Sequence, residues 1–344
     1  MAPVGADDAS ARLRAIWPGV MLANRGDDVS VLSPDWTFDV LLDNEDHVRE
    51  VAPLSCDVLV MQRTQARQLV EAIPLIQAQG TAVVVDIDDD FSQVHPRNAA
   101  YAAVHPKGNP ATNRRWLALA CKAADMVTCT TPALAAKYGH HGRCRVIPNR
   151  LPRQVLSIEH TDAEPLRIGW GGNIAVHPND LQVTGGAVRR VTDELGVVYV
   201  NVGPGGTAKA LGLETERATG FVDARRWFSR LATEVDIGIV PLEPTKFNAA
   251  KSSLALLTVS SVGVPAVVSP TPDNRRLHDL GMGVLAETPD DWYHQLRRLV
   301  TDEGRRAEVA ARSKQAARGE TLEAHLDPWV EAWALARHLH SRRR

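Results

Sequence analysis

Short apolar runs rich in β-branched residues alternate with longer amphipathic stretches along the whole chain, and this alternation constrains the fold more than any other feature of the sequence. The pattern is typical of β-α units, whose strands pair in parallel and whose helices cover the sheet. One predicted helix, at 63–79, places Leu69, Ile73 and Ile76 on one face and ends at Gly80. In the first part of the chain the pattern predicts strands at 29–32, 58–61, 82–85, 126–129 and 146–147 and a second helix at 113–124.

The segment at 151–165 interrupts this pattern, because it holds two prolines and several polar residues without a clear period. We interpret it as a linker, after which a second series of β-α units begins. That series consists of predicted strands at 166–170, 197–202, 219–222, 237–240 and 266–269 and helices at 252–262 and 290–300. A final helix at 322–340 carries an apolar stripe that must pack on another element, formed by Leu322, Leu326, Trp329, Val330 and Trp333.

The sequence therefore predicts an α/β fold with two doubly wound, Rossmann-like domains, at 1–155 and 156–320, and a closing C-terminal helix at 321–344. A length of 344 residues and a hydrophobic content of 44% suit two domains that each bury a core. Ligands of open α/β sheets bind outside the carboxyl ends of the strands. Two such domains that face each other thus form a cleft for a substrate of two parts.

The charge balance and the cysteines exclude several classes of protein. Lys and Arg number 39 and Asp and Glu 41, so the net charge of -2 gives no electrostatic case for nucleic acid or an anionic membrane as the main partner. No apolar run approaches the roughly 20 residues of a membrane span, and the N-terminus does not resemble a secretory signal. The four cysteines form no CxxC pair, so we expect reduced thiols in a cytoplasmic protein and no structural zinc site.

The most concentrated candidate site lies where the strand at 237–240 leads through a loop into a helix that begins near Ser252. The loop and helix start contain Phe247, Asn248, Lys251, Ser252 and Ser253. A helix N-terminus offers backbone N–H groups and the positive end of a dipole, and Lys251 adds a full charge. This combination suits a diphosphate, although an ordinary helix cap with a surface lysine has the same sequence.

A second candidate site follows the strand at 166–170. Gly171 and Gly172 lead to Asn173, and His177 and Asp180 come shortly after. A glycine pair lets a ligand approach the backbone closely, but the GxGxxG spacing of a dinucleotide site is missing. A structural turn explains the glycines equally well.

A third candidate site is acidic. Asp86, Asp88, Asp89 and Asp90 come at the end of a buried strand. Crowded carboxylates raise one another's pKa unless a cation or hydrogen-bond donors compensate. The cluster is compatible with a divalent metal, with a general base, or with simple capping of the next turn.

The order of these segments resembles GT-B glycosyltransferases, and specifically a family-4-like branch found among surface-polysaccharide and bacteriophage enzymes. The resemblance spans most of the chain, and its serial order is more specific than any single segment. The segments are 14–18, 83–91 (VVVDIDDDF), 124–139 (ADMVTCTTPALAAKYG), 146–152 (VIPNRLP), 167–181 (RIGWGGNIAVHPNDL) and 235–269 (VDIGIVPLEPTKFNAAKSSLALLTVSSVGVPAVVS).

The resemblance implies transfer of a sugar from a nucleotide-sugar donor to an acceptor hydroxyl, with retention of anomeric configuration and with no cofactor or metal beyond the donor as co-substrate. The donor is expected on the second domain and the acceptor on the first, toward which the last helix packs. The implied acceptor-side residues are Arg14, His177 and Asp180. Lys251 is the implied catalytic cation, and Asp88, Asp89 and Asp90 are base candidates if the reaction inverts. The implied donor-binding residues are Gly171, Gly172, Asn173, Phe221, Val222, Phe247, Asn248, Ser252 and Ser253.

The chain departs from the family pattern in three ways. The family often has two glutamates seven residues apart, and here those places hold Lys251 and Thr258. The second glutamate usually binds the ribose hydroxyls, for which Thr258 is a weaker substitute. The lysine that often precedes it appears as Ala255, and no obvious first strand and glycine loop come before Arg14.

Three other functions stay open on the sequence. The Thr258 departure suits a catalytically inactive sugar-nucleotide-binding module, and a sugar-nucleotide epimerase uses the same two-domain architecture. The segment at 83–88 also resembles the Asp-x-Asp strand of haloacid-dehalogenase-like phosphatases, with Asp86 as nucleophile, Asp88 as acid and magnesium bound. For a transferase, the acceptor could be a lipid-linked glycan, a protein or a modified DNA base, of which the net charge gives little support to DNA.

Overall fold

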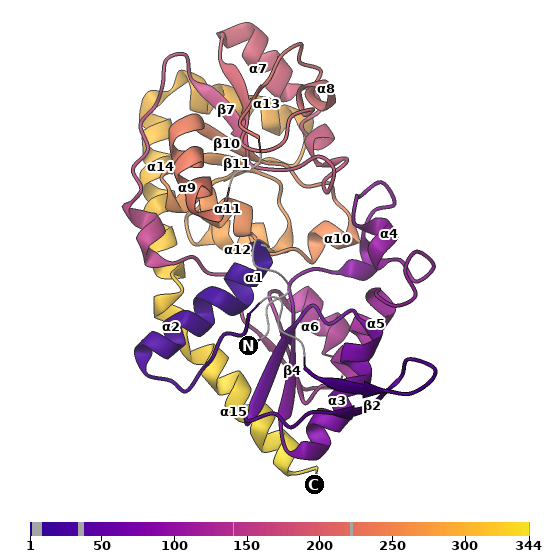
Figure 1. Cartoon of the computed structure of the whole chain (residues 1–344). Coiled ribbons are helices and arrows are strands. Elements are labelled where there is room, and N and C mark those ends of the chain that lie inside the picture. Colours follow the sequence, from indigo (N-terminus) through magenta and orange to yellow (C-terminus); the bar gives the residue numbers. More distant parts are fainter. Residues whose placement is uncertain (2–8, 34–37, 140, 221–222, 344) are drawn as a thin grey trace.

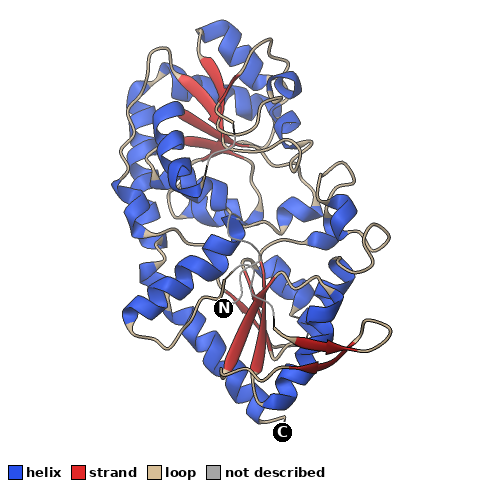
Figure 2. Ribbon diagram, in the orientation of Figure 1, coloured by secondary structure: helices blue, strands red, loops and turns tan. Residues whose placement is uncertain are grey.

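The computed structural model describes residues 1, 9–33, 38–139, 141–220 and 223–343. Two separate parallel sheets, each covered by helices on both faces, build two domains one above the other (Figures 1 and 2). The prediction of two Rossmann-like α/β domains is therefore confirmed. No helix in the described part of the chain is long and apolar enough to cross a membrane.

The first domain holds a parallel sheet in the order β3-β4-β5-β6. Alternate strand residues face opposite layers: Val83 and Val85 of β4 pack under α3 and α5, whereas Val84 packs toward the N-terminal helix and α15. The elements are β3 (Val58–Gln62), α3 (Arg67–Gln79), β4 (Ala82–Ile87), α4 (Tyr101–Val104), α5 (Arg114–Ala123), β5 (Met126–Cys129), α6 (Pro132–Tyr138) and β6 (Cys144–Val146).

The strand predicted at 29–32 is wrong. This segment instead lies against the first residue of the chain, because the amide of Leu32 donates to the carbonyl of Met1 and the amino group of Met1 donates to the carbonyl of Ser30. An antiparallel hairpin that the sequence pattern did not predict, β1 (Val40–Leu42) with β2 (Val48–Val51), follows and forms a sheet of its own.

The second domain holds a parallel sheet in the order β12-β11-β10-β7-β8-β9. The chain runs outward from β7 to β9 on one side and from β10 to β12 on the other, so β7 and β10 flank a topological switch point. The strands are β7 (Arg167–Trp170), β8 (Val198–Asn201), β9 (Arg217–Ala218), β10 (Ile237–Val240), β11 (Ala266–Val268) and β12 (Val284–Leu285). The helices are α7 (Ala187–Leu195), α8 (Ala208–Leu211), α9 (Ala224–Glu234), α10 (Lys246–Ala249), α11 (Leu254–Ser261), α12 (Pro272–Asp279), α13 (Pro289–Thr301) and α14 (Glu303–Ala317).

Several details of the second domain differ from the sequence pattern, which predicted helices only at 252–262 and 290–300 and did not predict β12. Instead of a strand at 219–222, the structure has β9 just before it, at Arg217–Ala218, and residues 221–222 lie outside the described part. Helix α14 escaped prediction because Val309 is its only large apolar residue in the core, so it shows no apolar stripe.

The chain crosses between the domains twice. The 3₁₀ turn η3 (Arg153–Ser157) occupies part of the interpreted linker, and Leu151 pairs with Thr321 on the returning segment. The last helix, α15 (Asp327–Ser341), runs along the first domain, where Trp329 and Trp333 pack with Val60, Val84 and Met126 of the first sheet (Figure 1).

The N-terminal helix reaches the boundary between the domains (Figure 1). It consists of α1 (Ala9–Ala11), a π-helical turn η1 (Arg12–Ile16) and α2 (Trp17–Arg25). Leu13 packs in the core of the second domain, and the ring of Trp17 lies 6.4 Å from that of Phe228 in α9. The helix therefore belongs by sequence to the first domain but packs on both.

Candidate functional site

The carboxyl ends of both sheets face one interdomain cleft, where the described residues line two cavities of note. The larger, of about 640 Å³, lies between the N-terminal helix and the ends of β7 and β8, and Gly172, Asn173 and Thr258 are part of its lining. The smaller, of about 310 Å³, lies between the segment 92–101 of the first domain and the segments 176–180 and 243–248 of the second. Both candidate segments of the second domain thus lie at the switch point, where open α/β sheets bind ligands.

Lys251 and Asp89, which the sequence singled out separately, meet across the two domains. The Lys251 Nζ lies 3.4 Å from the Asp89 Oδ1 and 4.8 Å from the centroid of the Phe247 ring. Both side chains are partly exposed, at 19% and 22%. Lys251 lines neither cavity, but Phe247 lines the smaller one. The ion pair between Asp89 of the first domain and Lys251 of the second therefore connects the two walls of the cleft.

Backbone contacts hold the loop that carries Lys251 against the first domain. The Thr131 hydroxyl donates to the Ala250 carbonyl at 2.8 Å, and the methyl group of Ala250 packs in the first domain's core. The Asn149 Nδ2 donates to the Ser252 Oγ at 2.9 Å. Consequently Ser252, a predicted donor ligand, already has a protein partner across the cleft.

The acidic cluster separates into residues with different partners. Both carboxylate oxygens of Asp88 accept from Arg63 at 2.6 Å, and one also accepts from Ser10. Burial raises the pKa of Asp88, but Arg63 and Ser10 outweigh burial and hold it below the usual aspartate range. A buried carboxylate with a lowered pKa and a bidentate arginine is a poor base, so the structure does not support Asp88 in that role.

Asp90 serves the capping role that the sequence left open. Its carboxylate accepts from the Ser92 amide at the start of the 3₁₀ turn η2 (Phe91–Gln93), from Lys137 at 2.8 Å and from Tyr138 at 3.1 Å. Asp90 is buried among these donors and, like Asp88, does not line either cavity. Asp89 alone of the three base candidates reaches across the cleft.

Arg14 lies inside the first domain rather than at the acceptor side. Its guanidinium is fully buried, donates twice to Asp86 at 3.0 and 2.8 Å and once to the Ile147 carbonyl at 2.6 Å, and lies 4.6 Å from the Trp329 ring centroid. It cannot reach an acceptor from there. Asp86 also accepts from Thr128 at 2.6 Å and is 1% exposed, so it does not fit the accessible nucleophile of a phosphatase.

His177 and Asp180 join the loops that follow β7 and β10. The His177 Nδ1 lies 2.8 Å from one Asp180 oxygen, and the other oxygen accepts from the Glu243 amide at 2.9 Å and from the Asn248 Nδ2 at 2.8 Å. Burial raises the pKa of Asp180, but these hydrogen bonds lower it further than burial raises it. All four residues line the smaller cavity.

Asn248, which lines the smaller cavity, has a buried side-chain acceptor that is not used within the described residues. Its Nδ2 donates to Asp180 and to the Glu243 carbonyl, which fixes the orientation of the amide. The opposite atom, Oδ1, is buried and makes no hydrogen bond within the described part of the protein. A buried acceptor without a partner costs about 1–3 kcal/mol.

The start of α11 differs from the sequence expectation of a free anion site. The Ser253 amide donates to a carboxylate oxygen of Asp273 at 2.7 Å, so an internal carboxylate occupies this N-terminus. The Ser253 Oγ is buried and has no hydrogen-bond partner among the described residues. The positive charge that α11 offers a ligand is therefore mainly that of the preceding Lys251.

The glycine pair has a packing reason as well as a place at the cleft. A Cβ on Gly171 would lie 3.0 Å from the ring of Trp227, and one on Gly172 would lie 2.3 Å from the ring of Trp170. Gly172 and Asn173 line the larger cavity, whereas Gly171 does not.

Thr258, which stands where the family often has the ribose-binding glutamate, also lines this cavity. The Thr258 hydroxyl donates to the Leu254 carbonyl at 2.7 Å. The predicted base-binding residues Phe221 and Val222 lie outside the described residues.

One group of residues with metal-ligand chemistry occurs in the described chain, and it lies away from the cleft. His160, Asp162 and Asp236 approach one another near the amino end of β10. Arg167 and Arg306 already pair with the two aspartates at 2.8 and 2.7 Å. These arginines neutralise the carboxylates and leave little reason for a cation to bind.

Sequence reasoning missed Arg12, Arg63 and Trp227. Arg12 and Trp227 line the larger cavity, and Arg63 pairs with Asp88 from a left-handed backbone conformation with φ of 46°. No periodic pattern in the sequence marks these residues, because the larger cavity and the partner of Arg63 are brought together only by the folded chain.

No family model and no curated protein matches the chain. Several solved structures are similar to it in fold. HepE of Anabaena, in complex with UDP and glucose, has 14% identity and a TM-score of 0.58, and the match covers 81% of this chain and 78% of HepE. The pneumococcal O-GlcNAc transferase GtfA, with UDP and GlcNAc, has 12% identity and a TM-score of 0.55 over 78% of this chain and 55% of GtfA.

A UDP-forming α,α-trehalose-phosphate synthase from Burkholderia xenovorans has 11% identity and a TM-score of 0.54 over 81% of this chain and 73% of that enzyme. These neighbours are GT-B glycosyltransferases. At such low identities the likeness concerns the fold, and it leaves the family-4-like and bacteriophage resemblance a prediction from sequence. The chain has the GT-B fold.

Proposed function

We propose that this protein is a glycosyltransferase that moves a sugar from a nucleoside-diphosphate sugar to an acceptor hydroxyl, with retention of configuration and without a metal or other cofactor. The observation that carries the proposal is the cleft itself. A glycine-lined cavity and a polar cavity flank the point where Lys251 meets Asp89, at the switch point of a GT-B fold. The UDP in the structures of HepE and GtfA supports a nucleoside diphosphate as the donor's leaving group.

The larger cavity suits the nucleoside of the donor. Its apolar wall contains Trp17, Trp227 and Phe228, and aromatic rings stack well on a planar base. Gly172 and Asn173 continue this cavity toward the switch point, where the diphosphate would lie. Phe221 and Val222 are retained as proposed neighbours of the base.

Lys251 is the proposed catalytic cation. Departure of the nucleoside diphosphate develops negative charge on its phosphates, and a fixed cation in a cleft that excludes water stabilises that charge. The contacts of Ala250 and Ser252 with the first domain fix the backbone on both sides of Lys251. In this proposal Ser252 acts on the phosphates indirectly, because it helps to hold the loop that carries Lys251, and Ser253 is retained as a proposed donor-binding residue.

The smaller cavity suits the transferred sugar and the acceptor. Asn248 and Phe247 are part of its lining, and the Phe247 ring offers an apolar face to a sugar. His177 and Asp180 complete the acceptor side of this cavity. Retention needs no side-chain base, so Asp89 would position Lys251 rather than deprotonate the acceptor.

A thermal-shift screen with UDP, GDP, dTDP and their sugar conjugates tests the proposal, because a ligand that binds only the folded state raises its melting temperature. We expect one nucleotide family to stabilise the protein, and its sugar conjugate to release the free nucleoside diphosphate when a glycan acceptor panel is added. Stabilisation by none of these compounds would contradict the proposal.

A catalytically inactive nucleotide-binding module is the second candidate. The observation in its favour is Thr258, whose hydroxyl proton is already donated to the Leu254 carbonyl. Nucleotide binding in the screen without slow donor hydrolysis and without transfer to any acceptor would favour this candidate over the transferase.

A further inference from the structure

Neither Lys251 nor the start of α11, the two groups that the sequence singled out for a diphosphate, offers a positive charge inside the larger cavity. Lys251 lies outside its lining and faces Asp89, and the Ser253 amide at the start of α11 is occupied by Asp273. If the cavity holds a nucleoside diphosphate, as the proposed function requires, another positive group must lie near the phosphates.

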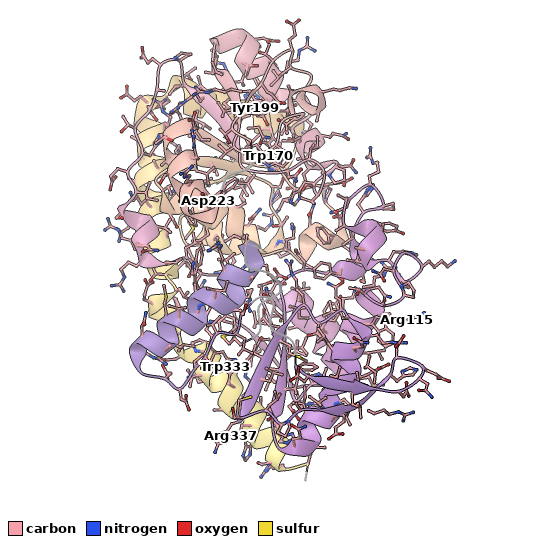
Figure 3. All side chains as sticks on the ribbon, viewed as in Figure 1. Arg115, Trp170, Tyr199, Asp223, Trp333 and Arg337 are labelled. Atoms are coloured by element: carbon pink, nitrogen blue, oxygen red, sulfur yellow. The ribbon has the colours of Figure 1, made fainter. Side chains whose placement is uncertain are left out.

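Arg12 is the basic residue among the described residues that line this cavity. The opposite wall is formed by Gly172 and Asn173, which follow β7, and by the segment after β8. Asp223 is the other charged residue of the lining, and it lies in the second domain at the start of α9 (Figure 3). Arg12 therefore brings a positive charge from the first domain to a cavity whose remaining walls are mostly apolar.

The backbone of Arg12 has an unusual geometry that directs neighbouring side chains to different sides. Residues 12–16 form a π-helical turn, in which the Trp17 amide donates to the Arg12 carbonyl five residues earlier. The turn lets Arg14 enter the core of the first domain while Arg12, Leu13 and Trp17 line the cavity. Such π turns are rare and occur often at functional sites.

Buried contacts on both sides hold this turn in place. On the first domain, Asp86 of β4 binds Arg14 in the turn, and Asp88 just after β4 binds Ser10 beside it. On the second domain, Leu13 lies in the apolar core and Trp17 contacts Phe228. Arg12 thus projects from a backbone that is fixed before any ligand binds, which lowers the entropic cost of binding.

We propose that Arg12 binds the diphosphate of the donor from the first domain, opposite Gly172 and Asn173. This inference rests on the proposed function and assigns a phosphate-binding role to a residue that the family resemblance did not. A guanidinium offers a planar fork of N–H donors that matches phosphate oxygens, and charge-assisted pairs of this kind are about twice as strong as neutral hydrogen bonds.

The test compares nucleoside diphosphates with nucleosides. Binding of UDP, GDP and dTDP and of uridine, guanosine and thymidine is measured by calorimetry for the wild type, Arg12→Ala, Arg12→Lys and a control, Arg115→Ala. Arg115 is an exposed arginine of α5 on the other flank of the first domain (Figure 3). Melting temperatures of all four proteins check that they fold.

We expect Arg12→Ala to weaken binding of the preferred nucleoside diphosphate by roughly tenfold to hundredfold and to leave binding of its nucleoside within about twofold. Arg12→Lys should keep part of the affinity, and Arg115→Ala all of it. Equal losses for diphosphate and nucleoside, or no loss for either, would overturn the role of Arg12 while leaving the proposed function intact. A wild-type protein that binds none of the three diphosphates overturns both proposals.

Discussion

Replacement of Arg14 by methionine provides a sharp test of whether this arginine is structural. Methionine fills much of the volume but leaves the Asp86 carboxylate, 1% exposed, with the Thr128 hydroxyl as its remaining side-chain donor among the described residues. Breaking a buried ion pair by removing one partner typically costs about 3–5 kcal/mol, because the other charge stays buried without compensation. The lost bond to the Ile147 carbonyl adds to this cost.

The double variant Arg14→Met/Asp86→Asn separates the two contributions. It removes the uncompensated carboxylate, so we expect it to be less destabilised than the sum of the single variants by about 1–3 kcal/mol. Urea unfolding followed by tryptophan fluorescence measures both values, since Trp329 lies against Arg14. If Arg14→Met costs less than about 1 kcal/mol, the arginine is not the buried anchor described here, and its predicted acceptor role regains support.

Three further predictions concern the cleft. Asp89→Asn should keep turnover within about tenfold if configuration is retained, whereas a loss of a hundredfold or more would identify Asp89 as a general base and an inverting reaction. Gly172→Ala should destabilise the protein by about 1–3 kcal/mol, because its Cβ would lie 2.3 Å from the Trp170 ring; Gly319→Ala, with nothing within 4 Å, is the control, and equal melting temperatures for the two variants would refute the packing argument. Asp180 has a folded-state pKa below its usual value of 3.8, so its contribution to stability is complete above that pH and is lost as the pH falls through the lower value. The difference in unfolding free energy between the wild type and Asp180→Asn should therefore shrink below about pH 4, and a difference independent of pH would contradict the hydrogen-bond network around Asp180.

Much of the fold could be predicted because its strands are short, buried and separated by helices with a clear apolar face. The strands at Met126–Cys129 and Ile237–Val240 match their predicted bounds, since parallel strands buried on both faces are continuous apolar runs. The N-terminal helix lacked such a signal. Its apolar residues serve two domains at once, and the π turn at 12–16 shifts their period.

The sequence could predict only those parts of the candidate site that are formed by residues close together along the chain. The loops after β7 and β10 were identifiable, and the structure brings His177, Asp180 and Asn248 together from them. The partners of the acidic cluster were not, because Asp88 binds Ser10 and Arg63, far away along the chain. Acidic residues that are neighbours in the sequence therefore suggest a single site, although in the structure each of them binds different partners.

The central claim is that Lys251 neutralises the departing nucleoside diphosphate, and the turnover number of Lys251→Ala with the preferred donor tests it most directly. The control is Lys246→Ala, an exposed lysine of α10 five residues earlier in the same connection. We expect Lys251→Ala to lower kcat by more than about tenfold, with an unchanged melting temperature, and Lys246→Ala to match the wild type. A folded Lys251→Ala protein that turns over at the wild-type rate would contradict the account.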